Sequence, residues 1–241
     1  MQELYSKPFD RIVSLGSDCR VRYQVSLSLY KRGLGGAAVD MAAFEKALYT
    51  RAREATASEG SYFFDWNVSP IEGVISCIRD DFSNVFKEEN LSITETGSVL
   101  DNATGIYFVH SFSRINGHST QEIIKTEFAK QKQKVTYLSE KFLDNIRKTD
   151  RTLYVRVGEN QQEAKEIVAA ISDKNAEHNF HVLMVRIDDG ESGTEHADQR
   201  MTIFRMNSQI DKPQIAHWQG DNVKWGALLD PVVLVKDSEA R

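Results

Sequence analysis

A cysteine follows the first apolar run of the chain, within the segment Arg11–Arg20, RIVSLGSDCR. The run Ile12–Leu15 is typical of a short strand, and the residues after it favour a helix. A thiol at such a strand-to-helix turn lies near unpaired backbone N–H groups and the positive end of the helix dipole, which lower its pKa. Cys19 is therefore a candidate nucleophile, and its neighbours Ser17 and Asp18 are candidate substrate-binding residues or helix caps.

Two further side chains could complete a cysteine-dependent site. His110 ends the apolar segment Gly105–Phe112, and Asp65 lies within the aromatic motif FFDW. In acyl transfer a thiolate attacks a carbonyl carbon, a histidine moves the proton, and a carboxylate can orient the imidazole. We therefore expect Cys19, His110 and Asp65 to be catalytic residues around one cleft. Each also has a structural interpretation, as a buried core side chain or as an acceptor for turn N–H groups.

Aromatic and acidic residues elsewhere could contact a substrate. Trp66 and Trp218 could be platforms for a sugar or another ring, although tryptophans more often pack in a core. Asp221 closely follows Trp218 and is a further candidate for substrate binding. Three histidines in polar stretches are predicted to be surface residues: His118, His178 and His196. Cys77, within an apolar helical run, is predicted to be inert core.

The composition is that of an ordinary globular protein, with 41% hydrophobic and 27% charged residues among 241. The net charge of −5 gives no basic footprint for nucleic acid. The chain has no apolar run of transmembrane length, its first residues do not resemble a signal peptide, and its two cysteines have no metal-binding spacing. We expect a cytoplasmic protein without metal or cofactor that binds neither nucleic acid nor membrane. Its substrate would be a small molecule, a peptide or a saccharide; the oligomeric state is left open.

The clearest fold signal is a strand–helix–strand pattern at Thr152–Val157, Gln161–Lys174 and His181–Ile187. Short connections in that order predict parallel strands joined by a right-handed crossover. With Arg11–Leu15 in the same sheet, the pattern predicts a single α/β domain over residues 1–241, in three α/β/α layers around a mainly parallel sheet. A helical insertion is expected near residues 37–60.

Other elements follow from periodicity and capping residues. Helices are expected at Cys19–Lys31, Met41–Ala55, Ile71–Phe82, Ser119–Lys148 and Asp221–Leu229, with further strands at Gly105–Phe112 and Met201–Met206. In open α/β sheets, ligands bind at the carboxyl ends of the strands. The turns at Gly16–Cys19, His110–Ser111 and Gly158–Asn160 are therefore expected to face one crevice.

The segment Val13–Cys19, VSLGSDC, and the motif Phe64–Trp66, FDW, resemble the bacterial and plant family of papain-like cysteine peptidases. The resemblance extends over most of the chain and implies a nucleophile at Cys19 and a histidine partner at His110. It also implies an alternative fold of the α+β class, in which the cysteine helix packs on an antiparallel sheet. The chain departs from the family pattern at Phe63, where proline is expected, and at Ser111, where an acidic residue is expected.

A second resemblance, to SGNH-type esterases, competes with the first. Those enzymes carry their nucleophile in a Gly-Asp-Ser turn after the first strand, the place of Gly16–Cys19 here. Their late Asp-x-x-His motif corresponds to Asp221–Lys224, with Lys224 in the histidine position. The sequence thus favours a cysteine-dependent hydrolase or acyl transferase. The alternatives are a saccharide-processing, transferase-like domain and a non-catalytic ligand-binding domain.

Overall fold

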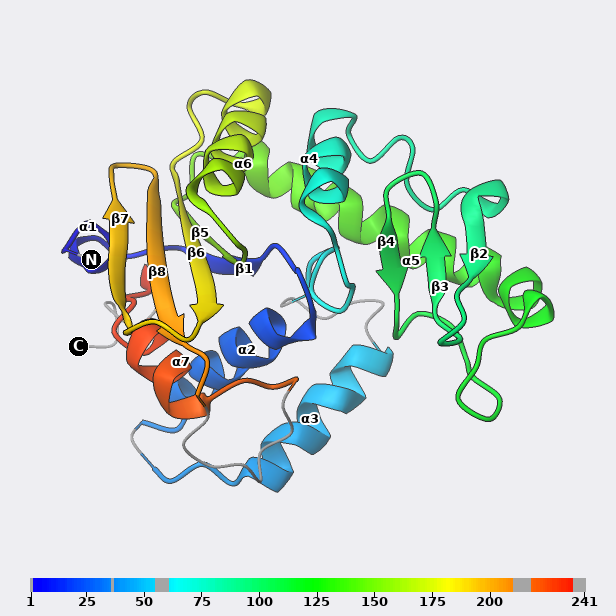
Figure 1. Ribbon diagram of the computed structural model, residues 1–241, viewed down its shortest axis with the longest axis horizontal. Helices are drawn as coiled ribbons and strands as arrows, with labels where there is room; N and C mark the ends of the chain where they lie inside the picture. Colours follow the sequence, from blue (N-terminus) through cyan, green and yellow to red (C-terminus); the bar gives the residue numbers. More distant parts are fainter. Residues whose placement is uncertain (1, 36, 55–60, 210–217, 236–241) are drawn as a thin grey trace.

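The main sheet has five strands, four of them parallel, with an antiparallel strand at one edge (Figure 1). The computed structural model describes residues 2–35, 37–54, 61–209 and 218–235 of the chain. In sheet order the strands are β1 (Arg11–Ser14), β5 (Thr152–Val157), β6 (Phe180–Asp188), β8 (Met201–Asn207) and β7 (Gly193–Ala197). The predicted α/β class and mainly parallel sheet are confirmed.

Helices cover both faces of this sheet. One face packs on α1 (Gln2–Ser6), α2 (Cys19–Gly33) and α7 (Asn222–Leu229), and the other on α4 (Ile71–Arg79), α5 (Gln121–Arg147) and α6 (Gln161–Lys174). Successive side chains of β5 point to opposite faces of the sheet. Leu153 and Val155 pack toward α2, while Tyr154 packs toward α5. The helix that carries Cys19 therefore packs on parallel strands, not on the antiparallel sheet of the papain-like alternative.

A second, antiparallel sheet lies beside α5, away from the main sheet (Figure 1). It comprises β2 (Leu91–Ile93), β3 (Val99–Asp101) and β4 (Ile106–Phe108), and a 3-10 turn at Glu88–Asn90 precedes it. The strand predicted over Gly105–Phe112 is thus much shorter and belongs to a different sheet. The chain turns after Phe108, and the Val109 carbonyl accepts a hydrogen bond from the Arg114 side chain (3.0 Å).

One of the histidines predicted to be at the surface is buried. His178 is 1% exposed and its two ring nitrogens contact the Tyr154 hydroxyl (3.1 Å) and the Lys148 carbonyl (2.7 Å). Buried hydroxyls need hydrogen-bond partners, and His178 together with Asn145 supplies them for Tyr154. Burial lowers the pKa of His178, so this histidine is a neutral structural residue.

A further helix, α3 (Met41–Glu54), lies in the predicted insertion at residues 37–60, of which 55–60 fall outside the described residues. Phe44 of α3 packs against Tyr23 and Tyr30 of α2, with ring centroids 5.5 and 5.3 Å apart. Helix α3 thus packs along the middle and the second half of α2. No helix in the described parts of the chain combines the length and the apolar character needed to cross a bilayer.

Candidate functional site

The turn between β1 and α2 directs consecutive side chains into two different hollows. Gly16 and Ser17 both adopt left-handed backbone conformations, each with φ of 72°. The turn is held by a hydrogen bond from the Ser69 N–H to the Ser17 carbonyl (3.2 Å). Asp18 then caps α2 by accepting from the Arg20 N–H (2.8 Å), which makes Cys19 the first residue of the helix.

The first hollow, called the cysteine hollow below, has a volume of about 460 Å³. It is lined by Asp18, Cys19, Arg20, Trp66, Val68, His110 and Trp218. The segment 61–70 and strand β4 lie side by side because Val68 and Tyr107 exchange two backbone hydrogen bonds (3.1 and 2.9 Å). That pairing places Trp66 against His110, which follows β4. The structure therefore brings Cys19 and His110 to one cavity, together with both candidate tryptophans.

The cysteine rests as a protonated thiol. Cys19 is 9% exposed, and burial together with the charges of Asp18 and Asp65 raises its pKa to about 12. A hydrogen bond from its own backbone N–H favours the thiolate, but this effect is smaller than that of burial. The expected lowering of the pKa is therefore wrong, because the helix terminus is buried and capped by a carboxylate.

The imidazole that shares the hollow is neutral near pH 7. The ring of His110 meets the Trp66 ring edge-on, with centroids 5.9 Å apart. Its pKa is lowered from the usual value, first by partial desolvation and then by the positive charges of Arg114 and Lys134. Cys19 and His110 thus form a thiol–imidazole combination, not a thiolate–imidazolium ion pair.

Asp65 is not among the residues that line the hollow. Its carboxylate is fully buried, accepts from the Tyr62 N–H (2.7 Å) and pairs with Arg22 (3.4 Å). Burial raises the pKa of Asp65 to about 6, against the opposing effects of Arg22 and the Tyr62 N–H. These contacts hold the turn that presents Trp66, and none of them reaches His110. A catalytic role for Asp65 stays a prediction, and its contacts fit a positioning role.

Arg20 lines the hollow but was not among the predicted site residues. Its Nε donates to the Trp218 carbonyl (3.4 Å), and an Nη atom lies 3.6 Å from the Asp18 carboxylate. The sequence carries a signal for it, because a positive residue in the first turn of a helix opposes the helix dipole. In the structure the Asp18 carboxylate lies close enough to offset part of this positive charge.

The remaining predicted substrate-binding residues are divided between the hollow and its surroundings. Trp218 is 40% exposed and packs edge-on against Tyr23, with ring centroids 5.4 Å apart. Asp221 does not line the hollow; it caps α7 by accepting from the N–H groups of Val223 (2.8 Å) and Lys224 (3.1 Å). Its carboxylate therefore has a structural function.

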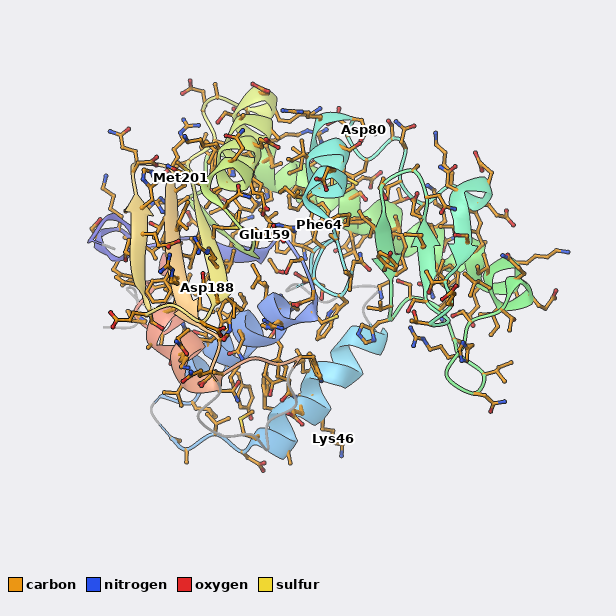
Figure 2. All side chains as sticks on the ribbon, in the orientation of Figure 1. Lys46, Phe64, Asp80, Glu159, Asp188 and Met201 are labelled. Carbon is orange, nitrogen blue, oxygen red and sulfur yellow. The ribbon has the colours of Figure 1, made fainter. Side chains whose placement is uncertain are left out.

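The second hollow, called the strand-edge crevice below, lies at the carboxyl ends of β1, β5 and β6 and has a volume of about 650 Å³. Glu159 and Asp188, labelled in Figure 2, mark the ends of β5 and β6. The residues that line the strand-edge crevice are Ser17, Pro70, Ile71, Glu72, Arg156, Val157, Gly158, Glu159, Glu163, Arg186, Ile187 and Asp188. The single crevice expected from the sequence is thus two hollows, with Ser17 in one and Cys19 and His110 in the other.

Fold and site together define an α/β protein with a cysteine–histidine hollow beside its first parallel strand. Comparison with family models, with curated proteins and with solved structures found no significant match. Within the described residues, no group of three or more histidine, cysteine or acidic side chains is placed to hold a metal ion. The function must therefore be argued from the geometry of the two hollows.

Proposed function

We propose that the cysteine hollow is the active site of a cysteine-dependent acyl hydrolase or acyl transferase, with Cys19 as nucleophile and His110 as general base. The observation that carries this proposal is the presence of both side chains in the lining of one hollow, although they come from α2 and from the turn after β4. A cysteine that only fills space in the core would not require a neutral histidine in the lining of the same cavity, whereas a nucleophilic cysteine requires a base there.

The protonation states set the order of events. The Cys19 thiol is protonated and His110 is neutral at pH 7, so His110 accepts the thiol proton as the sulfur attacks a substrate carbonyl. The new carbon–sulfur bond gives a tetrahedral oxyanion. Its collapse expels an amine or alcohol, which takes the proton back from His110. Water, or a second substrate, then attacks the thioester, with His110 again acting as base, and releases Cys19.

The walls of the hollow indicate the kind of acyl group. Trp66 and Trp218 present aromatic surface suited to an apolar or ring-containing substrate. The Arg20 N–H is already bonded to Asp18, but the Arg20 guanidinium can approach a developing oxyanion or a substrate carboxylate. Asp65 acts as a positioning residue that fixes the turn bearing Trp66.

An acyl-trapping experiment tests this proposal. The protein is incubated with p-nitrophenyl acetate, release of nitrophenol is followed, and the acylated residue is located by peptide mass spectrometry. We expect the acetyl group on Cys19. Cys19→Ala should abolish acylation, and His110→Gln should slow it by about a hundredfold, the lower end of general-base contributions.

The matched control is Cys77→Ala, which removes the other cysteine thiol. Cys77 lies in the hydrophobic core on α4 and does not line the cysteine hollow. Cys77→Ala should acylate at the wild-type rate. Acylation that survives Cys19→Ala, or that is indifferent to His110→Gln in a folded variant, would contradict the proposal.

A second candidate function, saccharide binding without covalent chemistry, is favoured by one observation. Two tryptophans and an arginine converge on the same hollow, and aromatic rings are common platforms for sugars. Saccharide affinity that is lost in Trp66→Ala and Trp218→Ala but retained in Cys19→Ala, in a protein that is never acylated, would support this function over the first.

A further inference from the structure

A further cavity lies between α2 and α3, which pack side by side (Figure 1). It is called the α2–α3 cavity below, and its volume is about 420 Å³. Most of its wall is apolar, with large side chains from both helices: Leu29, Tyr30, Phe44 and Leu48. All of its lining residues belong to the described parts of the chain. A concave, mainly apolar space of this size is typical of a site for an apolar group.

The charge in the wall of this cavity is already matched. Among the lining residues, Arg22 is the only one with a charged side chain, and it pairs with Asp65 (3.4 Å). The Ser26 hydroxyl is buried and is not accessible from the cavity. The α2–α3 cavity is therefore suited to an uncharged alkyl group and not to a charged head group.

Cys19 lies on the face of α2 that borders the cavity. The α2 residues in the lining recur every three or four positions, at Arg22, Ser26, Leu29, Tyr30 and Gly33. An α-helix makes one turn in 3.6 residues, so this spacing marks one face, and Cys19, three residues before Arg22, lies at its start. With a rise of about 1.5 Å per residue, this face extends about 21 Å from Cys19 to Gly33.

Trp66 lies where the α2–α3 cavity meets the cysteine hollow, since it belongs to the lining of both. A small space of about 30 Å³ also borders this tryptophan. It shares His110 with the cysteine hollow and Ser61 with the α2–α3 cavity. The reactive groups and the apolar cavity are thus neighbours, with the Trp66 side chain between them.

We propose that the α2–α3 cavity holds the alkyl chain of the acyl group that is transferred to Cys19, and that this chain has about eight to twelve carbons. The inference rests on the acyl transfer proposed above and adds no covalent step to it. The chain extends from the carbonyl carbon at Cys19 past Trp66 and along α2. If each carbon takes up about as much space as a water molecule, ~30 Å³, such a chain fits within 420 Å³.

The competing interpretation is that the cavity is only a packing gap between α2 and α3. A packing gap explains the apolar wall, but it does not explain why Cys19 lies on the same helix face or why Trp66 borders both spaces. It predicts that filling the cavity leaves the preference for acyl chains unchanged.

Acylation of Cys19 by two esters tests the proposal. p-Nitrophenyl acetate and p-nitrophenyl octanoate have the same leaving group and differ only in the chain, and peptide mass spectrometry identifies the acylated residue. We expect the second-order rate constant for octanoate to exceed that for acetate at least tenfold, because the longer chain removes apolar surface from water. Equal rate constants, or a faster reaction of the acetate, overturn this proposal but leave the cysteine-dependent acyl transfer standing.

Two variants on α3 locate the bound chain. Ala47 lines the cavity and is exposed, so Ala47→Phe narrows the cavity at a position with room for a larger side chain. It should lower the ratio of the octanoate rate constant to the acetate rate constant at least fivefold. Ala42→Phe is the matched control, because Ala42 is also exposed on α3 but does not line the cavity, and it should keep the wild-type ratio. Equal ratios in the two variants overturn the assignment of the chain to this cavity.

A binding measurement separates this proposal from the proposed function. If neither ester acylates Cys19, the proposed function fails, and with it the assignment of the chain to an acyl group. Calorimetric titration with 1-octanol then tests the cavity without any nucleophile. Octanol binding that Ala47→Phe weakens and Ala42→Phe retains supports the α2–α3 cavity as an alkyl site, whereas no binding to the wild-type protein overturns it.

Discussion

The cysteine hollow and the strand-edge crevice share one turn of the chain but are built in opposite ways. The hollow is walled by tryptophans, and its two candidate catalytic groups are held neutral by partial burial. The crevice is walled by charged side chains, and Arg156 remains charged within it, since burial lowers its pKa only to about 10.

The difference shows how burial acts on different side chains. Desolvation keeps a thiol and an imidazole in their neutral forms at pH 7, whereas a guanidinium has too high a pKa to lose its proton. The hollow is consequently suited to proton transfer within a covalent reaction. The crevice keeps its charged groups ionised. Each of the following predictions would sharpen or break this contrast.

The largest expected effect is the pH dependence of cysteine labelling. Because the pKa of Cys19 is raised to about 12, its thiolate fraction grows tenfold per pH unit. Alkylation by iodoacetamide should therefore accelerate by about a thousandfold between roughly pH 7 and pH 10, without a plateau. Cys77, which is buried in the core, should remain unlabelled in the folded protein. A plateau below pH 8 would mean that the hollow does hold a thiolate.

The second prediction concerns the support beneath the hollow. Asp65→Ala should lower the free energy of unfolding by about 3 kcal/mol, because the buried Tyr62 N–H loses its acceptor and Arg22 loses its partner. Urea denaturation measures the change. The control is Asp18→Ala, which removes the partly buried cap of α2 and should cost only about 1 kcal/mol. Equal losses of unfolding free energy in the two variants would contradict the view that the buried contacts of Asp65 stabilise the fold more than a helix cap does.

The third prediction is a pH effect on stability. Burial raises the pKa of Asp65 to about 6, so the folded state binds the proton more tightly than the unfolded state. The stability that comes from protonating Asp65 is complete below about pH 4 and is lost as the pH rises through 6, a change of about 3 kcal/mol. Asp65→Asn should lack this decline. Identical pH profiles of the free energy of unfolding for both proteins would contradict the raised pKa.

The smallest predicted effect is on His110. Trp66→Ala removes the ring that packs on this imidazole and lets water approach it. The pKa of His110 should rise toward its usual value, by less than about one unit, because the charges of Arg114 and Lys134 remain. The shift of its ring proton resonances during an NMR titration measures this change. A fall in the pKa would show that Trp66 does not desolvate the ring.

Periodic local patterns made much of the fold predictable. The bounds of β5 and α6 agree with those expected from the sequence, and β6 extends the expected strand by one residue at each end. The apolar pattern was misleading for Gly105–Phe112, because only Ile106–Phe108 of this segment form a strand. Phe108 and Phe112 pack around the ring of Phe86, at centroid distances of 4.7 and 5.8 Å, so their burial comes from an aromatic cluster and not from a long strand.

The candidate site was only partly predictable for a related reason. Cys19 was found from its place in a strand-to-helix turn, but its pKa depends on the burial of that turn, which no local pattern reports. Arg156 lies inside the apolar run TLYVRV, whose pattern indicates only a strand. A charged residue in a buried strand is itself a signal, because its cost requires a compensating partner.

The hydrogen bond between Ser69 and Ser17 has an evolutionary consequence. The short segment that it anchors carries Trp66 into the hollow and Pro70 into the crevice, and four residues span at most about 14 Å. An insertion or deletion within this segment would alter both cavities at once. Lineages of this protein should therefore vary the length of other surface loops freely, while a change in the spacing between Trp66 and Pro70 should be accompanied by changes in the lining of both cavities.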